Sequence, residues 1–256
     1  MPERQHGKGA ARSTLFLALL VTAAVVTAVR ANFWKTDLRV ASVEVRGNSI
    51  VPSAELLSLA HIAAGEKLFD VDLYAASKRL LENRFVRSAS VNREVPDRIT
   101  ISVRERIPIG VVLAQKKLYL DAEGYVLPPA VSENIFDLPV LTGPFPSGDL
   151  VPGRRVSSPL MQEGLSVLTT ARALGDDVYR QLSEVRVEEG KDILAYTAEG
   201  GIPVIIGHGD LGPKLVKFEG FWNDIILHHG VQDLQYIDLR FDDRVVVRWT
   251  HTPEDV

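Results

Sequence analysis

The chain has 256 residues, which allows one large or two modest domains and is long enough to bury a hydrophobic core. The formal net charge is −4, and no dense Lys/Arg run occurs beyond the N-terminus. Both observations argue against a nucleic-acid partner, which would need a basic face. The absence of cysteine excludes disulfides and thiolate chemistry but says little about the compartment.

The N-terminal part predicts a tail followed by a membrane anchor. Residues 1–13 are polar, with three cations and one acid, which is typical of a disordered cytoplasmic tail. Residues 14–29 are uncharged and mostly apolar, but this run is shorter than the roughly 20 residues a bilayer requires. Arg30 can direct its charge towards the interface, and the apolar surface continues to Trp34. We therefore predict a single transmembrane helix over residues 14–34.

The flanking charges predict the orientation of this anchor. Basic residues before the span place the N-terminus in the cytoplasm and residues after 34 outside the inner (plasma) membrane, although Arg30, Lys35 and Arg39 weaken the asymmetry. A cleaved signal peptide is the alternative, with Val29-Arg30-Ala31 as its cleavage site. An arginine beside the scissile bond makes that site poor, so we favour an uncleaved anchor. A tether of residues 36–38 would hold the next domain close to the membrane.

Residues 39–107 predict one complete small domain. Val43 and Val45 alternate with polar residues, which is the period of a half-buried strand. Ser53 is expected to supply a hydroxyl N-cap for a helix ending near Gly65, and Asp70 or Asp72 is expected to cap a second helix ending near Asn83. Strands over 88–95 and 98–104, joined by Pro96-Asp97, complete the order βααββ.

This segment resembles a POTRA domain, and more narrowly the POTRA domain of the FtsQ/DivIB cell-division family. The resemblance is carried by an ordered set of motifs: Val45-Arg46-Gly47-Asn48, Phe69-Asp70-Val71-Asp72 and Val103-Arg104-Glu105-Arg106-Ile107-Pro108. Each motif alone is weak, and the ordered set is much more specific. The alternative is a small α+β domain without POTRA kinship.

Residues 108–250 predict a second, strand-rich domain with helices packed on its sheet, so the fold class is α+β. Helices are expected to begin at Ser158-Pro159 and at Gly212-Pro213, and most strands are expected to pair as hairpins. Residues 251–256 are expected to be a flexible tail. The family resemblance continues through Tyr119-Leu120-Asp121-Ala122-Glu123-Gly124, Leu138-Pro139-Val140-Leu141-Thr142-Gly143 and Tyr236-Ile237-Asp238-Leu239-Arg240-Phe241.

The sequence does not predict a catalytic, cofactor or metal site, and we expect no enzymatic activity and no small-molecule substrate. The six histidines lack the spacing of a zinc site. Gly207-His208-Gly209-Asp210-Leu211-Gly212 matches the dinucleotide-binding pattern G-x-G-x-x-G. The helix after it is expected to lead into a terminal hairpin rather than a parallel strand, so we predict a turn-forming role for these glycines.

The last strand is the candidate site for binding a partner protein. A strand at the end of a chain often lies at a sheet edge, where its free peptide groups can accept another strand. In the FtsQ family this region binds the coiled-coil partners FtsB and FtsL, FtsB by adding to the sheet. The resemblance would place the partner-binding residues at Arg240, Phe241, Arg244, Val245, Val246, Val247, Arg248 and Trp249. The resemblance would place a tyrosine at the position of Phe241, so this chain lacks the hydroxyl group that such a tyrosine would offer for a hydrogen bond.

The alternative interpretation of this strand is structural: the valines and Trp249 would be core residues, and the arginines would protect the edge against aggregation. With the family resemblance, the sequence predicts a non-enzymatic scaffold of the bacterial divisome. It would link cytoplasmic and periplasmic division proteins at the septum and help control septal peptidoglycan synthesis. Alternatives are a POTRA-type chaperone of outer-membrane assembly or secretion, and an envelope ligand-binding protein using residues 207–212.

Overall fold

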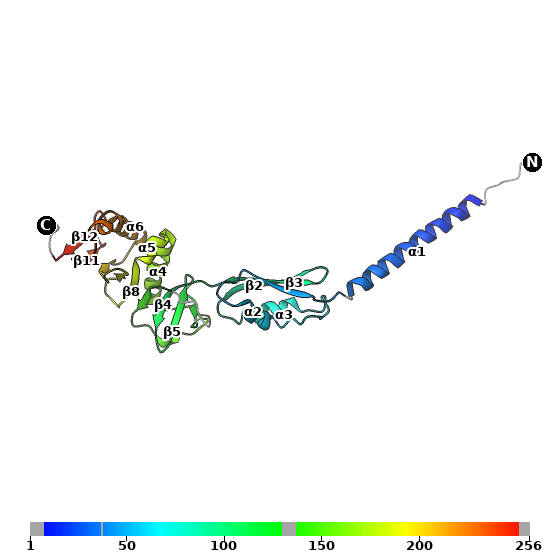
Figure 1. Ribbon diagram of the computed structural model, residues 1–256, viewed down its shortest axis with the longest axis horizontal. Helices are drawn as coiled ribbons and strands as arrows, with labels where there is room; N and C mark the ends of the chain where they lie inside the picture. The colour runs from blue at the N-terminus through cyan, green and yellow to red at the C-terminus, as the bar shows by residue number, and fades with distance from the viewer. Residues whose placement is uncertain (1–7, 37, 130–136, 251–256) are drawn as a thin grey trace, which may run out of the picture. The chain divides into compact units, whose positions relative to one another are not determined.

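The computed structural model describes residues 8–36, 38–129 and 137–250, with side chains described for residues 16–30, 38–129 and 137–250. The chain divides into two compact units, Met1–Arg104 and Glu105–Val256 (Figure 1). Both units contain strands, and helices pack on the sheet of each, as the α+β prediction requires.

The first helix, α1, spans Lys8–Thr36 without interruption. Its sequence has no glycine or proline after residue 9, so nothing breaks the backbone hydrogen-bond ladder. The prediction of a disordered tail is therefore wrong for residues 8–13, which are helical, while residues 1–7 lie outside the described residues. Among the described residues, no helix has both the length and the apolar character needed to cross a membrane.

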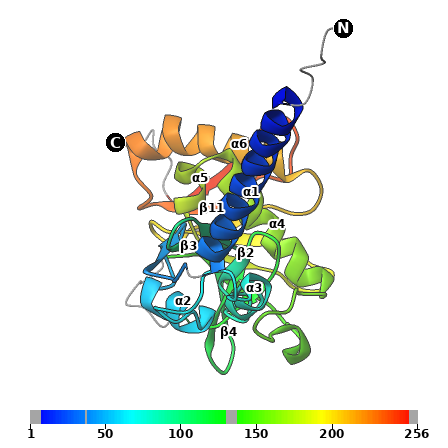
Figure 2. The same cartoon turned by 90° about the vertical axis from the view of Figure 1, so that its right-hand side faces the viewer.

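The predicted βααββ order is confirmed in the first unit. Its elements are β1 (Ser42–Arg46), α2 (Ser53–Ala60), α3 (Leu73–Leu80), β2 (Val86–Glu94) and β3 (Arg98–Glu105). The sheet order is β1-β3-β2, with β1 parallel to β3. Figures 1 and 2 show α2 and α3 together on one side of this sheet.

The caps of the two short helices differ from each other. The Asp72 side chain accepts a hydrogen bond from the Ala75 amide at 2.9 Å, so the predicted cap of α3 is confirmed. The predicted hydroxyl cap of α2 is wrong, because Ser53 is the first helical residue and therefore stands one position too late to cap. Its hydroxyl instead accepts from Asn48 at 3.1 Å. The helix ends at Ala60, earlier than predicted, because His61 adopts a left-handed conformation.

Gly47 explains why one of the family motifs requires glycine. Its φ is +83°, and a Cβ at this position would lie 2.2 Å from the Val103 carbonyl oxygen. A side chain would meet both backbone strain and a rigid obstacle. Glycine therefore allows the chain leaving β1 to pass close to β3.

The second unit is built on one sheet of nine strands among its described residues. The strands are β4 (Pro108–Leu113), β5 (Lys117–Asp121), β6 (Val126–Leu127), β7 (Val140–Thr142), β8 (Leu182–Arg186), β9 (Leu194–Thr197), β10 (Pro203–Ile205), β11 (Leu234–Asp238) and β12 (Val246–Trp249). Their order across the sheet is β12-β11-β10-β9-β8-β7-β4-β5-β6.

Helices pack on this sheet and enclose its main core. They are α4 (Pro159–Leu174), α5 (Asp176–Arg180), α6 (Leu211–Phe221), a π-helical turn (Trp222–Ile226) and α7 (Leu227–His229), with a 3-10 turn at Ser147–Asp149. Ser158 caps α4 and Pro159 is its first residue, as predicted. Phe218 and Met161 are fully buried, and the Phe218 and Trp222 rings lie 5.6 Å apart.

Three parallel strand pairings in this sheet were not predicted. The expected terminal hairpin of β11 and β12 is present, but β11 also runs parallel to β10, so β10, α6 and β11 form a β-α-β unit. Likewise β7 is parallel to both β4 and β8. The strands β7 and β10 have three residues each, which is too short for a period of two to reveal their pairing.

Candidate partner-binding edge

The strand β12 lies at one edge of the nine-stranded sheet. It pairs antiparallel with β11, with Val247 opposite Ile237 and Val246 opposite Asp238. No other strand in the described part of the chain pairs with it. One side of the β12 backbone is therefore not used by any described strand.

Hydrogen-bond directions show which peptide groups face outward. The Thr250 amide donates to the Asp233 carbonyl at 2.7 Å, so the peptide groups of Thr250 face β11. Peptide groups alternate in direction along a strand, which places those of Val246 and Arg248 on the β11 side. The peptide groups of Val247 and Trp249 therefore point away from the sheet.

The side chains of β12 also alternate, between the core and the exposed face of the sheet. Val245, Val247 and Trp249 are half-buried and pack against the main core, whereas Arg248 is exposed and Val246 is half-buried. The side chains of Val247 and Trp249 thus contribute to the core while their peptide groups face outward. The core and docking interpretations of this strand are therefore compatible, because they concern different groups of the same residues.

A charged clamp holds the turn between β11 and β12. Arg240 donates to both carboxylate oxygens of Asp238, at 3.0 Å from Nε to Oδ1 and 2.6 Å from Nη2 to Oδ2. Its Nη1 also lies 2.9 Å from Asp192, in the connection between β8 and β9. The Asp238 side chain is only 6% exposed, whereas that of Arg240 is 45% exposed. The hydrogen bonds from Arg240 hold the pKa of Asp238 below its ordinary value despite burial.

Gly207 makes room for this clamp. Its φ is +66°, and a Cβ there would lie 2.8 Å from Cγ of Arg240. Any larger residue would therefore displace the arginine as well as strain the backbone. Gly207, Asp192 and Asp238 were not among the predicted site residues. The glycine pattern at 207–212 drew attention to this loop, but nothing in the sequence indicated that Arg240 lies against it.

The other predicted site residues lie before the strand or at its exposed surface. Lys217 of α6 donates to the carbonyl oxygens of Phe241 and Asp242, which fixes the turn to the helix. The Phe241 side chain is 45% exposed. Arg244 pairs with its neighbour Asp243 at 2.9 Å, and both side chains are exposed. The described turn therefore presents one aromatic ring next to the edge strand.

The glycine-containing loop of residues 207–212 connects β10 to α6 and so lies in a β-α-β unit, contrary to the expectation from the sequence. Polar groups in and around this loop bond to one another. The buried Lys214 amine donates to the carbonyl oxygens of Ile206, at 2.9 Å, and His208, at 2.5 Å. The Asp210 side chain accepts from the Gly212 amide at 3.2 Å. Asp238, the acid at the end of the next strand, is paired with Arg240. These contacts fit the predicted turn-forming role.

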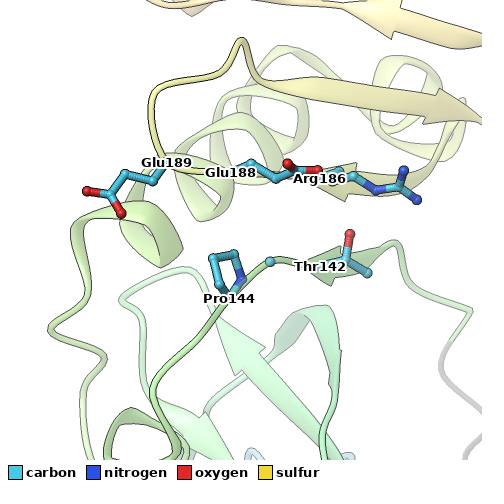
Figure 3. Close-up of a pocket in the computed structure, with 6 residues that line it drawn as sticks. Thr142, Pro144, Arg186, Glu188 and Glu189 are labelled. Atoms are coloured by element: carbon cyan, nitrogen blue, oxygen red, sulfur yellow. The ribbon is translucent and has the colours of Figure 1, made fainter.

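A shallow pocket of about 410 Å³ lies at the ends of β7 and β8. Figure 3 shows Thr142 and Pro144 on one wall and Glu188 and Arg186 on the other. Arg186 is held by Glu184 at 2.9 Å and by the Tyr196 hydroxyl at 3.0 Å. The described residues contain no group of His, Asp and Glu side chains that could hold a metal ion.

Family models match both units of the chain. The model described as "POTRA domain, FtsQ-type" matches residues 38–106, and the model described as "Cell division protein FtsQ/DivIB, C-terminal" matches residues 110–240. The chain belongs to the FtsQ/DivIB family of cell-division proteins. The resemblance predicted from the motifs is thereby confirmed. The second match ends at Arg240, so β12 lies beyond the matched residues.

Individual FtsQ proteins match nearly the whole chain. A "Cell division protein FtsQ" from Rhodothermus marinus is 34% identical over 242 residues, which cover 91% of this chain and 86% of the relative. Another from Syntrophotalea carbinolica is 30% identical over 250 residues, covering 97% and 88%. One from Geobacter sp. (strain M21) is 29% identical over 213 residues, covering 83% and 77%. FtsQ family membership supports a role in the division machinery of the cell envelope, with partners among division proteins.

Proposed function

We propose that this protein is a non-enzymatic scaffold of the divisome that binds a partner by strand addition to β12. The observation that supports this proposal is the outward direction of the Val247 and Trp249 peptide groups on an edge strand. Main-chain hydrogen bonds would supply affinity, and side chains on the exposed face would supply selectivity. The residues in contact would be those predicted from the sequence, Arg240, Phe241 and 244–249.

The clamp around Arg240 supports this proposal by ordering the site before the partner arrives. Asp238 and Asp192 fix the guanidinium, and Lys217 fixes the backbone at Phe241. A turn held in this way loses little conformational freedom on binding, which favours affinity. By the family resemblance, the partners would be the FtsB/FtsL coiled-coil pair. Through them the protein would link cytoplasmic and periplasmic division proteins and help control septal peptidoglycan synthesis.

The membrane anchor over residues 14–34 is part of the same proposal. It is supported by the continuity of α1 through this span and by the exposed apolar side chains on the described part of the helix, which include Phe16, Leu20 and Val25. Thr22 and Thr27 donate their hydroxyl groups to carbonyl oxygens one turn earlier, at 2.7 Å in each case. Polar groups satisfied within the helix suit a lipid environment.

A proline scan of two adjacent residues would test strand addition. The Val247 amide faces outward, so Val247→Pro removes a donor needed by an added strand without removing a bond to β11. The Val246 amide faces β11, so Val246→Pro breaks the native ladder and serves as the matched control. The experiment uses the full chain in detergent and measures the Kd for the FtsB/FtsL pair.

We expect Val247→Pro to weaken binding by about tenfold or more, since it removes a hydrogen bond and places a ring against the incoming strand. Its unfolding temperature should fall less than that of Val246→Pro, because Val247→Pro changes the packing of a half-buried side chain but removes no bond to β11. Val246→Pro should lower the unfolding temperature. Unchanged partner binding by a folded Val247→Pro variant would refute strand addition at this edge.

A further inference from the structure

The POTRA domain has a distinct end at which the chain arrives from α1. The Leu68 amide donates to the Leu38 carbonyl at 2.8 Å, and the Ala41 amide donates to the Asp97 carbonyl at 2.7 Å. The first residues of the domain are therefore bonded to two loops at once. We name this surface the entry end and define it as residues 38–41, 65–72 and 93–98.

The entry end exposes two large apolar side chains, one on each loop. Phe69, just before α3, is 47% exposed, and Val95, in the turn between β2 and β3, is 66% exposed. Neither side chain belongs to the buried core of the domain. Exposed apolar groups at adjacent loop tips indicate a surface suited to an apolar environment.

Arg93 joins the two loops into one unit. Its Nε donates to the Leu68 carbonyl at 2.7 Å, and its Nη2 donates to the Val71 carbonyl at 2.5 Å. The guanidinium also lies 5.8 Å from the centre of the Phe69 ring. Arg93 stands two residues before Val95 in the sequence. Its hydrogen bonds therefore fix the loop that carries Phe69 to the strand end that carries Val95. A rigid pair of apolar groups loses little entropy when it contacts a second surface.

We propose that the entry end rests on the outer surface of the membrane, with Phe69 and Val95 inserted among the lipid headgroups. This inference rests on the membrane anchor proposed above. The helix α1 ends at Thr36, two residues before Leu38, and two residues reach at most about 7 Å. The headgroup region adds about 5 to 8 Å on each side of the hydrocarbon core. The loop bonded to Leu38 therefore lies within reach of the headgroups wherever α1 crosses the bilayer.

The charges of the entry end predict which lipids it prefers. Its ionisable residues are Arg39, Lys67, Arg93, Arg98, Glu66, Asp70, Asp72, Glu94 and Asp97. Cations and acids nearly balance, so attraction to anionic headgroups gives no net advantage. Contact should depend on apolar insertion and should be similar for zwitterionic and anionic lipids.

The absence of cysteine in the natural chain permits a clean labelling test. Single-cysteine variants Phe69→Cys and Val95→Cys of the full chain are labelled with an environment-sensitive fluorophore and placed in phosphatidylcholine nanodiscs. Quenching by headgroup spin labels is then measured. Arg84→Cys, which is exposed and lies just before β2, at the opposite end of that strand from Val95, is the control within the same domain. Val29→Cys, in α1, reports whether the anchor is embedded.

We expect the labels at 69 and 95 to be quenched at least about twofold more strongly than the label at 84, because position 84 lies the length of β2 away from the entry end. Adding phosphatidylglycerol should leave this ratio unchanged, and Phe69→Asp should reduce quenching of the label at 95. Quenching at 29 but not at 69 or 95 would overturn the contact and leave the anchor standing. No quenching at 29 would overturn the anchor, and the contact with it.

Discussion

The two edges of the nine-stranded sheet share an aspartate–arginine pair beside the edge strand, but only one of the two edge strands is covered by another segment of the described chain. On each side, the strand next to the edge ends in a buried aspartate, Asp121 at the end of β5 and Asp238 at the end of β11. Each aspartate is paired at 2.6 Å with an arginine, Arg106 or Arg240. Each pair holds the turn that leads to the edge strand, β6 on one side and β12 on the other.

The β6 edge is covered. The Val126 amide donates to the Arg154 carbonyl at 2.9 Å, and the Gly153 amide donates to the Val126 carbonyl at 2.7 Å. Arg106 is only 13% exposed and stacks 3.7 Å from the centre of the Tyr125 ring, whereas Arg240 is 45% exposed. An exposed edge strand can pair with strands of other proteins and so promote aggregation. In this sheet the segment around residues 153–156 covers the β6 edge. The β12 edge lacks such a covering segment among the described residues, and this contrast favours a docking role for it.

The largest expected effect is the loss of stability when the Asp121–Arg106 pair beside the covered β6 edge is broken. Asp121→Ala leaves the mostly buried Arg106 with Glu123, at 3.0 Å, as its remaining charged partner and removes the acceptor for the Glu123 and Tyr125 amides. The free energy of unfolding should fall by about 3 kcal/mol or more. Asp238→Ala should cost about 1.5 kcal/mol, because the half-exposed Arg240 can be hydrated.

Denaturant unfolding followed by tryptophan fluorescence measures this difference, since Trp222 and Trp249 both lie in the second unit and Trp222 is buried. The two variants should rank in the opposite order when partner binding is measured instead of stability. Asp238→Ala should weaken it, and Asp121→Ala should leave it unchanged in the protein that remains folded. Equal losses of stability at the two sites would contradict the distinction between a closed and an open edge.

A smaller effect is expected from the glycine that accommodates Arg240. Gly207→Ala places a side chain at φ +66° and brings a Cβ to 2.8 Å from the arginine side chain. The backbone strain alone should cost about 1 to 2 kcal/mol, and the displaced arginine should weaken partner binding further. Gly209→Ala is the matched control, because its φ is +98° but nothing lies within 4 Å of the added Cβ. Equal partner affinities for the two variants would show that Arg240 has no positioning role.

The sequence predicted the features that depend on local patterns. The βααββ order, the Asp72 and Ser158 caps and the final hairpin follow from periodicity and from residues near each helix start or turn. The family resemblance supplied the candidate site, including Arg240 and β12. Sequence reasoning alone could place β12 at the end of the chain, and its position at the sheet edge comes from the topology.

The features it missed depend on contacts between distant residues. Asp192 and Arg240 are 48 residues apart, and Gly207 meets Arg240 only because β10 and β11 are parallel neighbours. The covering of β6 joins residues 124–126 to 153–156 across a long loop. No period or spacing in the sequence encodes such contacts, because they follow from how the elements pack.

The smallest expected effect is the pH dependence of the stability that the Asp238–Arg240 pair contributes beside the β12 edge. Hydrogen bonds from Arg240 lower the pKa of Asp238 from its ordinary value of 3.8. An acid with a lowered folded-state pKa adds stability that is fully present above 3.8 and is lost as the pH falls through the folded value. The difference in unfolding temperature between the natural protein and Asp238→Asn should therefore be constant near neutral pH and shrink below about pH 4. Asp243→Asn is the control, because its pair with Arg244 is exposed and screened by solvent, so it should change the unfolding temperature little at any pH. A difference for Asp238→Asn that persists unchanged to pH values well below 3 would mean that the carboxylate charge does not hold the turn, and that the open edge depends on shape alone.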